Sequence, residues 1–334
     1  MDRPLPDSVR APQRQVAARG SRLARLQQVL VLGALALALA WALFWWPHSP
    51  VVGLAGAAAL LGGYALVLAL EGLAAARANR HEQLPRAGVR GVLGAWWQEV
   101  RAAPATFAWR QPFRWRCLPD DATPSSFPGP TVVFLHGFVC NRGFWLPWMA
   151  HLRARGVPYV SVNLEPVFGE IDAYVPLVDE AVRRARELTG RPPLLVCHSM
   201  GGLAARAWLA AQPQAAVERP AAISRVVTIG TPHRGTRLAR FSRVGNGRQM
   251  RPEGEWLAAL AARERELRGP SPYARFTCFH SNTDNIVFPA SSGRLPGADN
   301  RLVPGAAHVA LAFHPRVLRE TLELLHAPDP AGAA

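Results

Sequence analysis

The sequence contains no lysine, although it carries 38 basic residues and a formal net charge of +15 at pH 7. All of its fixed positive charge is therefore arginine. Arginine, alanine, glycine and proline have GC-rich codons and lysine does not, so the bias indicates a GC-rich coding sequence. A nucleic-acid-binding protein would gather basic residues on one surface or carry a recognisable binding module. Neither feature is visible, and we predict no nucleic-acid partner.

Cysteine is also scarce, with Cys117, Cys140, Cys197 and Cys278 as the only four among 334 residues. They form no CxxC pair and have no zinc-ligand spacing. The histidines show no HExxH spacing and no accompanying cluster of carboxylates. We therefore predict four small buried thiols and no metal or cofactor.

Two long runs near the N-terminus have no charged residue, at positions 29–46 and 51–70. At a rise of about 1.5 Å per residue, each run as a helix would extend roughly 27–30 Å, close to the hydrocarbon thickness of a bilayer. A secretory signal peptide would have a shorter apolar core and a cleavage site, whereas here a second run follows a turn at 47–50. We predict a transmembrane hairpin over residues 29–70, with the lipid bilayer as a partner.

Arginines flank this hairpin on both sides and are absent from its turn. Residues 1–28 form a tail with six arginines and two aspartates. The positive-inside tendency places such flanks in the cytoplasm. We therefore predict that the tail and everything after the hairpin are cytoplasmic.

Residues 71–129 are predicted as an interfacial or linker region, and from 88 to 130 aromatic and basic residues alternate. Such a segment can rest at a membrane interface, with its rings in the headgroup layer and its guanidinium groups on lipid phosphates. The alternative is a pair of edge strands, around 107–109 and 113–117. The sequence leaves both possibilities open, and a turn-rich stretch at 124–130 then separates this region from the next.

Residues 130–326 alternate between short apolar runs and helical patterns. Nearly continuous apolar strands of this kind predict an α/β fold, with a mostly parallel sheet covered by helices on both faces. Active sites of such sheets lie at the carboxyl ends of the strands. The five runs are Thr131–Leu135, Tyr159–Leu164, Pro193–Cys197, Ser224–Ile229 and Phe276–His280.

Ser199 follows one of these runs directly and precedes Gly201 and a helical pattern. A strand that enters a helix through such a sharp turn forms a nucleophile elbow, which exposes its central side chain in a cleft. The turn needs small residues two positions before and after the nucleophile. Gly201 meets this need, and Cys197 is small enough to be tolerated. We predict Ser199 as a catalytic nucleophile.

His136 and Gly137 follow the first run. An oxyanion needs two N–H donors about 3 Å from the position where its charge develops. We predict the main-chain N–H groups of Phe138 and Met200 as these donors, because Phe138 follows Gly137 and Met200 follows the nucleophile.

A serine hydroxyl needs a base, and the base needs an orienting carboxylate. In this type of sheet the order along the chain is serine, acid, histidine. Asp284 follows the run at 276–280, and His308 follows the next short run. We predict Asp284 as the acid and His308 as the base. Asp299 is the rival acid, but it precedes a strand and is close in sequence to His308.

Two other histidines lie close to these motifs in the sequence. His198 precedes the nucleophile and should point away from the cleft, because neighbouring side chains diverge at an elbow. His233 follows a strand and could line the site. We predict a structural role for His198, and packing or loop anchoring for His233.

Five motifs in this order resemble the α/β-hydrolase superfamily, and specifically its bacterial lipase and esterase branch. The resemblance covers residues 130–326 and implies an α/β-hydrolase fold and an enzyme that hydrolyses carboxylic esters, lipid esters among the candidates, through an acyl-serine. With the hairpin, it implies a multi-pass protein of the bacterial inner membrane, without an obligate protein partner. The motifs are H-G-F (136–138), C-H-S-M-G-G (197–202), T-P-H-R-G-T (231–236), D-N-I-V-F-P (284–289) and G-A-A-H-V-A-L (305–311).

Two alternatives remain beside an esterase. The same site could transfer an acyl group to another acceptor or cleave a thioester, and a scaffold could retain the fold without catalysis. Similar enzymes carry a cap over the cleft at the position of residues 235–270, and an amphipathic stretch around Trp256, Leu257 and Leu260 could receive an acyl chain there. A solvated helix pair is the alternative. Residues 327–334 are predicted to form a flexible tail.

Overall fold

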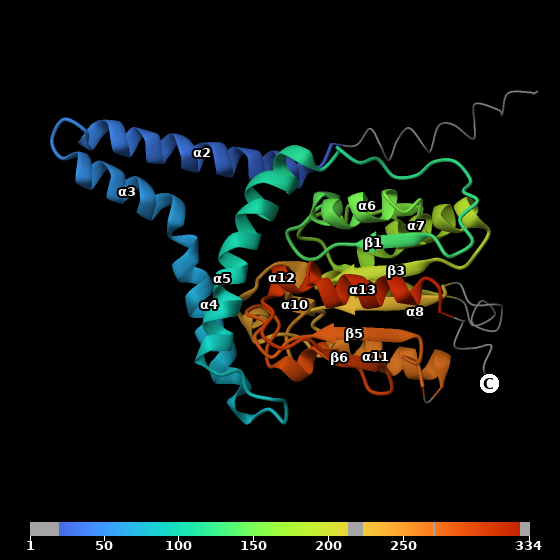
Figure 1. Cartoon of the computed structure of the whole chain (residues 1–334). Helices are drawn as coiled ribbons and strands as arrows, with labels where there is room; N and C mark the ends of the chain where they lie inside the picture. Colours follow the sequence, from blue (N-terminus) through green and yellow to red (C-terminus); the bar gives the residue numbers. More distant parts are fainter. Residues whose placement is uncertain (1–19, 213–222, 270, 328–334) are drawn as a thin grey trace, which may run out of the picture.

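The computed structural model describes residues 20–212, 223–269 and 271–327, and Figure 1 shows a parallel sheet with helices packed around it. The six strands follow the order β2-β1-β3-β4-β5-β6, and each neighbouring pair is parallel. The strands are β1 Val132–Leu135, β2 Tyr159–Ser161, β3 Leu194–His198, β4 Arg225–Ile229, β5 Phe276–His280 and β6 Asp299–Leu302. The five predicted strands are confirmed, with ends that differ by a few residues.

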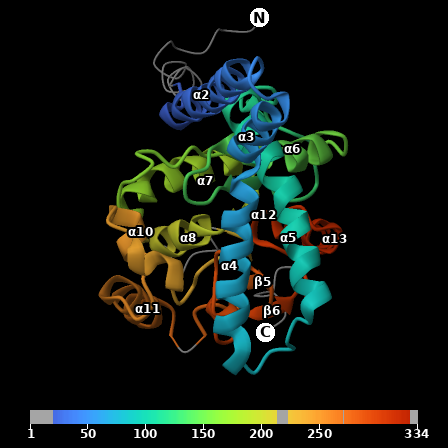
Figure 2. The ribbon, with the colours of Figure 1, turned by 90° about the vertical axis from the view of Figure 1, so that its left-hand side faces the viewer.

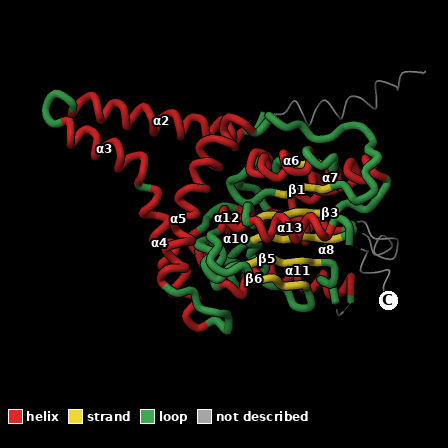
Figure 3. The backbone as a smooth tube through the Cα atoms, viewed as in Figure 1, coloured by secondary structure: helices red, strands yellow, loops and turns green. Residues whose placement is uncertain are grey.

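Both faces of the sheet are buried, which explains the continuous apolar runs. Side chains of a strand alternate between faces, so Val133 and Leu135 belong to one hydrophobic cluster, and Val132 and Phe134 belong to the other. Helices cover both faces (Figure 3). The first cluster includes α7 Val175–Thr189 and α8 Met200–Ala211, and the second includes α6 Leu146–Arg153, α12 His308–Ala312 and α13 Pro315–Leu324.

Of the two predicted membrane-spanning runs, only the first forms a single long helix. Helix α2, Arg22–Trp45, is the one helix of the described residues that is long and apolar enough by itself to cross a membrane. The second run is broken into α3, Pro50–Gly62, and α4, Tyr64–Ala78, which are bent by 45°. The bend lies at Gly62 and Gly63, and glycines favour sharp kinks because they stabilise a helix poorly.

Helix α4 and helix α5, Val89–Ala103, pack against each other on the side of the sheet domain that faces the viewer in Figure 2. We call α4 and α5 the edge helices, and α2 and α3 the apolar arm. Asn79, directly after α4, fixes this arrangement because its side chain donates to Asn282 O at 3.1 Å and accepts from Ala290 N at 2.9 Å. The edge helices are therefore packed on the sheet domain, whereas the arm projects from it (Figure 1).

The alternative edge strands at 107–109 and 113–117 do not form. Residues Pro104–Arg114 are instead a π-helix that continues α5. Gln111 on this helix is fully buried, and its side-chain oxygen accepts from Asn141 N at 2.9 Å. This contact, together with the packing of Phe107 on a hydrophobic cluster, holds the segment against the domain as a helix.

Residues 235–270, predicted as a cap, contain α10 Gly245–Gln249 and α11 Glu255–Arg268. Leu257 of α11 belongs to the hydrophobic cluster on the α8 side of the sheet. A buried ion pair of 2.7 Å joins Arg206 of α8 to Glu264 of α11. Helix α11 therefore packs on the sheet domain through Leu257 and Glu264.

Three of the four cysteines are buried as predicted, but Cys117 is exposed because it follows the π-helix at the surface. The predicted tails lie largely outside the described residues, at positions 1–19 and 328–334.

Candidate active site

Ser199 lies between β3 and α8 with a positive φ of 53° and ψ of −127°. Positive φ is strained for a residue with a side chain and persists where the surrounding structure enforces it. The main-chain N–H of Ser199 donates to Ile229 O at 2.9 Å, which fixes the turn against β4. A Cβ on Gly201 would lie 2.4 Å from Leu135 O, so only glycine fits there. These contacts form a strained turn of the nucleophile-elbow type.

The loop after β1 lies directly against Ser199. A Cβ on Gly137 would approach the Ser199 Cβ to 2.8 Å. The His136 ring fixes the start of this loop, since its Nδ1 lies 2.9 Å from Gly137 O and its Nε2 accepts from Leu164 N at 3.0 Å. Burial lowers the pKa of His136 to about 4, so the ring is neutral and suited to both contacts. The main chain that leads into Phe138 therefore lies beside Ser199.

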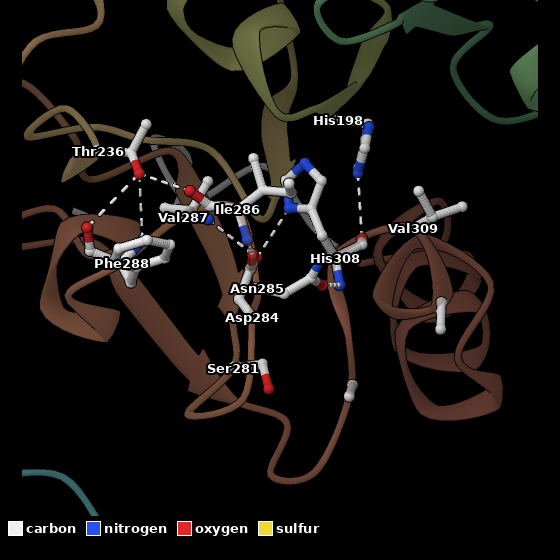
Figure 4. A network of polar contacts seen from close by, with 12 residues as sticks. His198, Thr236, Ser281, Asp284, Asn285, Ile286, Val287, Phe288, His308 and Val309 are labelled. Atoms are coloured by element: carbon white, nitrogen blue, oxygen red, sulfur yellow. Dashed lines mark hydrogen bonds and ion pairs between the residues drawn. The ribbon is translucent and has the colours of Figure 1, made fainter. Parts of the chain in front are cut away.

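His308 and Asp284 meet at the same edge of the sheet. Nδ1 of His308 donates to Oδ2 of Asp284 at 2.9 Å (Figure 4). The other oxygen of Asp284 accepts from Ile286 N at 2.9 Å and Val287 N at 2.7 Å. The carboxylate is therefore held in place, and with the proton on Nδ1 the Nε2 atom of His308 can act as a base.

The electrostatic surroundings favour protonation of His308. Burial alone lowers the pKa of the imidazole, but the negative charges of Asp284, Glu99 and Glu71 and the hydrogen bond to Asp284 outweigh this effect and raise it. A raised pKa increases the strength of the base. The charge distribution therefore suits proton transfer at Nε2.

Ser199 and His308 are brought to the same place by neighbouring parts of the fold. A Cβ on Gly230, which follows β4, would lie 3.1 Å from Asp284 Oδ2 and 3.2 Å from His308 Nδ1. Ile229, the preceding residue, is bonded to the Ser199 main chain. Within the described residues no hydrogen bond joins the Ser199 hydroxyl to His308, whose ring partner is Asp284. Such contacts often tighten only when substrate is bound.

The remaining candidates are placed elsewhere. Asp299 lies on β6 and pairs with Arg301 at 2.7 Å. His233 is buried with Nε2 at 3.0 Å from Thr228 Oγ1, which confirms its predicted anchoring role. His198 does not point away from the site as predicted. Its ring lies 4.6 Å from that of His308, and its Nε2 donates to His308 O at 3.2 Å.

Three residues at the site were missed by sequence reasoning. Asn285 accepts from the His308 main chain at 3.1 Å. Glu71 and Glu99 reach the same loop from the edge helices. Both glutamates are carboxylates within a largely apolar helical stretch, and that pattern was the available signal for them. No group of histidine, cysteine or carboxylate side chains in the described ranges could hold a metal ion.

Comparisons with known proteins agree with the fold. The family model described as "Alpha/beta hydrolase family" matches residues 132–321. The mature form of the lipase BlEst2 of Bacillus licheniformis is similar in fold, with a TM-score of 0.50 and 18% identity over 61% of this chain and 96% of that chain. Lipase B of Aspergillus fumigatus has a TM-score of 0.50 and 18% identity, over 62% of this chain and 56% of that chain. The comparison with curated proteins found no match.

Proposed function

The chain belongs to the alpha/beta hydrolase family, and we propose on that basis that it is a serine hydrolase of carboxylic esters. The observation that carries the proposal is the buried His308–Asp284 pair, which lies at the same edge of the sheet as Ser199 on its strained turn. The lipases that share the fold support an ester substrate.

In the proposed reaction, Oγ of Ser199 attacks the ester carbonyl carbon while Nε2 of His308 takes the hydroxyl proton. The N–H groups of Phe138 and Met200 stabilise the negative oxygen of the tetrahedral intermediate. The intermediate collapses, the ester C–O bond breaks, and His308 returns the proton to the departing alcohol. Water then attacks the acyl-serine in the same way and releases the acid and the free serine.

The proposal includes a membrane anchor. Helix α2 has the length and composition of a membrane span, and only 6% of its most apolar window is buried within the protein. With α3 and the start of α4, up to residue 70, as a second, broken span, the arginine-rich flanks favour a catalytic domain in the cytoplasm of a bacterial cell, at the inner membrane. Fusion of a reporter that is active only in the cytoplasm to Ala334 should therefore give a signal, and a signal from a periplasm-specific reporter would contradict this orientation.

A fluorophosphonate probe tests the catalytic proposal, because it labels activated serines. The full chain in detergent should be labelled, and Ser199→Ala should not. With a chromogenic short-chain ester, Ser199→Ala should lower kcat by a factor on the order of 10⁶. Ser281→Ala, a buried serine at the end of β5, is the matched control and should retain labelling. Labelling of neither wild type nor control would favour a non-catalytic scaffold.

A further inference from the structure

We propose that Glu99 of edge helix α5 is a positioning residue for His308, with Glu71 of edge helix α4 as its counterpart. The inference rests on the proposed function, since His308 is the base of that reaction. It assigns to the N-terminal helices a role in catalysis that is separate from membrane anchoring.

Glu99 is held in a fixed position beside the base. Its side chain is 2% exposed. One carboxylate oxygen accepts from Val309 N at 2.9 Å, and the other accepts from Val309 N and Ala310 N, both at 3.1 Å. These are the N–H groups that follow His308 directly. A buried carboxylate is stable only when it accepts hydrogen bonds. The bonds to Glu99 therefore fix the position of the main chain directly after His308.

Glu71 acts on the main chain of His308 itself, through the amide side chain of Asn285. Its Oε2 accepts from Asn285 Nδ2 at 2.9 Å, and Oδ1 of the same asparagine accepts from His308 N at 3.1 Å. Three consecutive main-chain N–H groups, from 308 to 310, therefore depend on the two edge helices. The opposite side of this segment is held by His198, which donates to His308 O at 3.2 Å.

The same two carboxylates act on His308 through their charge. The ionisable groups that face the imidazole are Asp284 from the loop after β5, Glu99 and Glu71 from the edge helices, and His198 from β3. Burial lowers the pKa of His198 well below its usual value, so its ring is neutral and adds no positive charge. The three carboxylates raise the pKa of His308 against the effect of burial. Burial raises the pKa of Glu99 itself to about 7, so its charge responds to pH near neutrality.

The test is the pH profile of kcat/KM for the full chain in detergent, with a chromogenic ester whose product is read at one fixed pH. Glu99→Gln keeps an acceptor for the Val309 N–H but removes the charge. The acid limb, which reports deprotonation of the base, should move to lower pH. At the pH where wild type retains half of its plateau kcat/KM, the variant should retain a larger fraction of its own plateau. One pH unit lower, that fraction should be at least about twofold the wild-type fraction.

Glu71→Gln should shift the limb in the same direction by less, because Glu71 acts on His308 more weakly than Glu99 does. Glu323→Gln, the same change at an exposed position on α13, is the matched control and should leave the profile unchanged. A purely structural role for Glu99 would lower kcat/KM equally at all pH values. An unshifted acid limb in Glu99→Gln would therefore overturn the proposal.

A second readout does not depend on activity. NMR titration of ¹³C-labelled histidine in the full chain, with the His308 signal assigned by its loss in His308→Asn, should show a lower pKa in Glu99→Gln than in wild type. If the protein has no esterase activity but this shift occurs, the proposed function fails and the coupling of Glu99 to His308 stands. An unchanged His308 pKa would overturn the coupling whatever the activity.

Discussion

The apolar arm and the edge helices are neighbours in sequence, but they are stabilised in opposite ways. Leu37 of α2 is 58% exposed and Leu54 of α3 is 57% exposed, so the arm presents its apolar side chains outward. The edge helices turn a buried carboxylate, Glu99, toward the domain and bond it to main-chain N–H groups. Consecutive N-terminal helices therefore present apolar side chains outward in one part and support a polar site in the other.

Charge introduced into the arm should have a larger effect than any change in the edge helices. An arginine at the centre of a membrane helix disfavours insertion by about 3 kcal/mol, so Leu37→Arg combined with Leu60→Arg, at the centres of the two apolar runs, should weaken insertion by roughly 6 kcal/mol. The variant should leave the membrane fraction on alkaline extraction. The matched double alanine variant should remain there, and a double arginine variant that also remained would contradict a lipid-facing arm.

In the edge helices, removal of a charge should stabilise the protein at high pH. Folding raises the pKa of Glu99 from 4.5 to about 7, so the folded state binds the proton more tightly and the free energy of unfolding falls as pH rises through that window. Glu99→Gln avoids this loss. Chemical denaturation should show the variant more stable than wild type by up to about 3 kcal/mol above pH ~8.

Below the unfolded-state pKa of about 4.5, the free energies of unfolding of wild type and Glu99→Gln should depend on pH in the same way. Glu99 is then protonated in both the folded and the unfolded state of wild type. A stability difference that did not change between high and low pH would show that Glu99 is not buried as a charge. Together with the activity profile, such a gain in stability would identify a residue retained for function at the expense of stability.

A smaller effect is expected from the amide that joins the edge helices to the base. Asn285→Ala leaves the His308 N–H and the Glu71 carboxylate without a partner, at a free-energy cost of about 1–3 kcal/mol. We expect kcat/KM to fall roughly tenfold to a hundredfold. Asn300→Ala, which also removes side-chain bonds to main-chain groups but lies on β6, is the control and should leave kcat/KM within about twofold of wild type.

The smallest effect should come from the arm's own polar contact. Trp41 Nε1 donates to Val52 O at 3.2 Å and joins α2 to α3. Hydrogen bonds between membrane helices contribute about 0.6 kcal/mol on average. Trp41→Phe should therefore lower the unfolding temperature slightly and leave kcat/KM unchanged. A large loss of activity would mean that the arm, like the edge helices, supports the site.

The sheet could be predicted because its strands are buried on both faces, and such strands appear in sequence as apolar runs like 194–198. The positions of Ser199, Asp284 and His308 followed from the order in which loops leave a parallel sheet. The direction of His198 was wrong because its ring position is decided by packing against Phe144, 4.4 Å away, and not by the turn alone.

The edge helices could not be predicted in this way. Glu71 contacts a residue 214 positions away, and Glu99 contacts one 210 positions away. Glu71 lies on α4, beyond the 45° bend at Gly62 and Gly63, and Glu99 lies on the next helix along the chain. Composition alone predicts that a charge-free segment suits lipid, but it does not show which part of an apolar run packs on the protein itself.

Trapping of the acyl-enzyme would decide whether Ser199 is the nucleophile. The full chain is mixed with excess ester, quenched in acid within the first turnovers, digested and analysed by mass spectrometry. We predict one added acyl group on the peptide that contains Ser199, and little or none in His308→Ala under the same quench, because His308 takes the serine proton in the acylation step. Active enzyme that forms no acyl adduct on any residue, or one on a residue other than Ser199, would contradict the proposed mechanism.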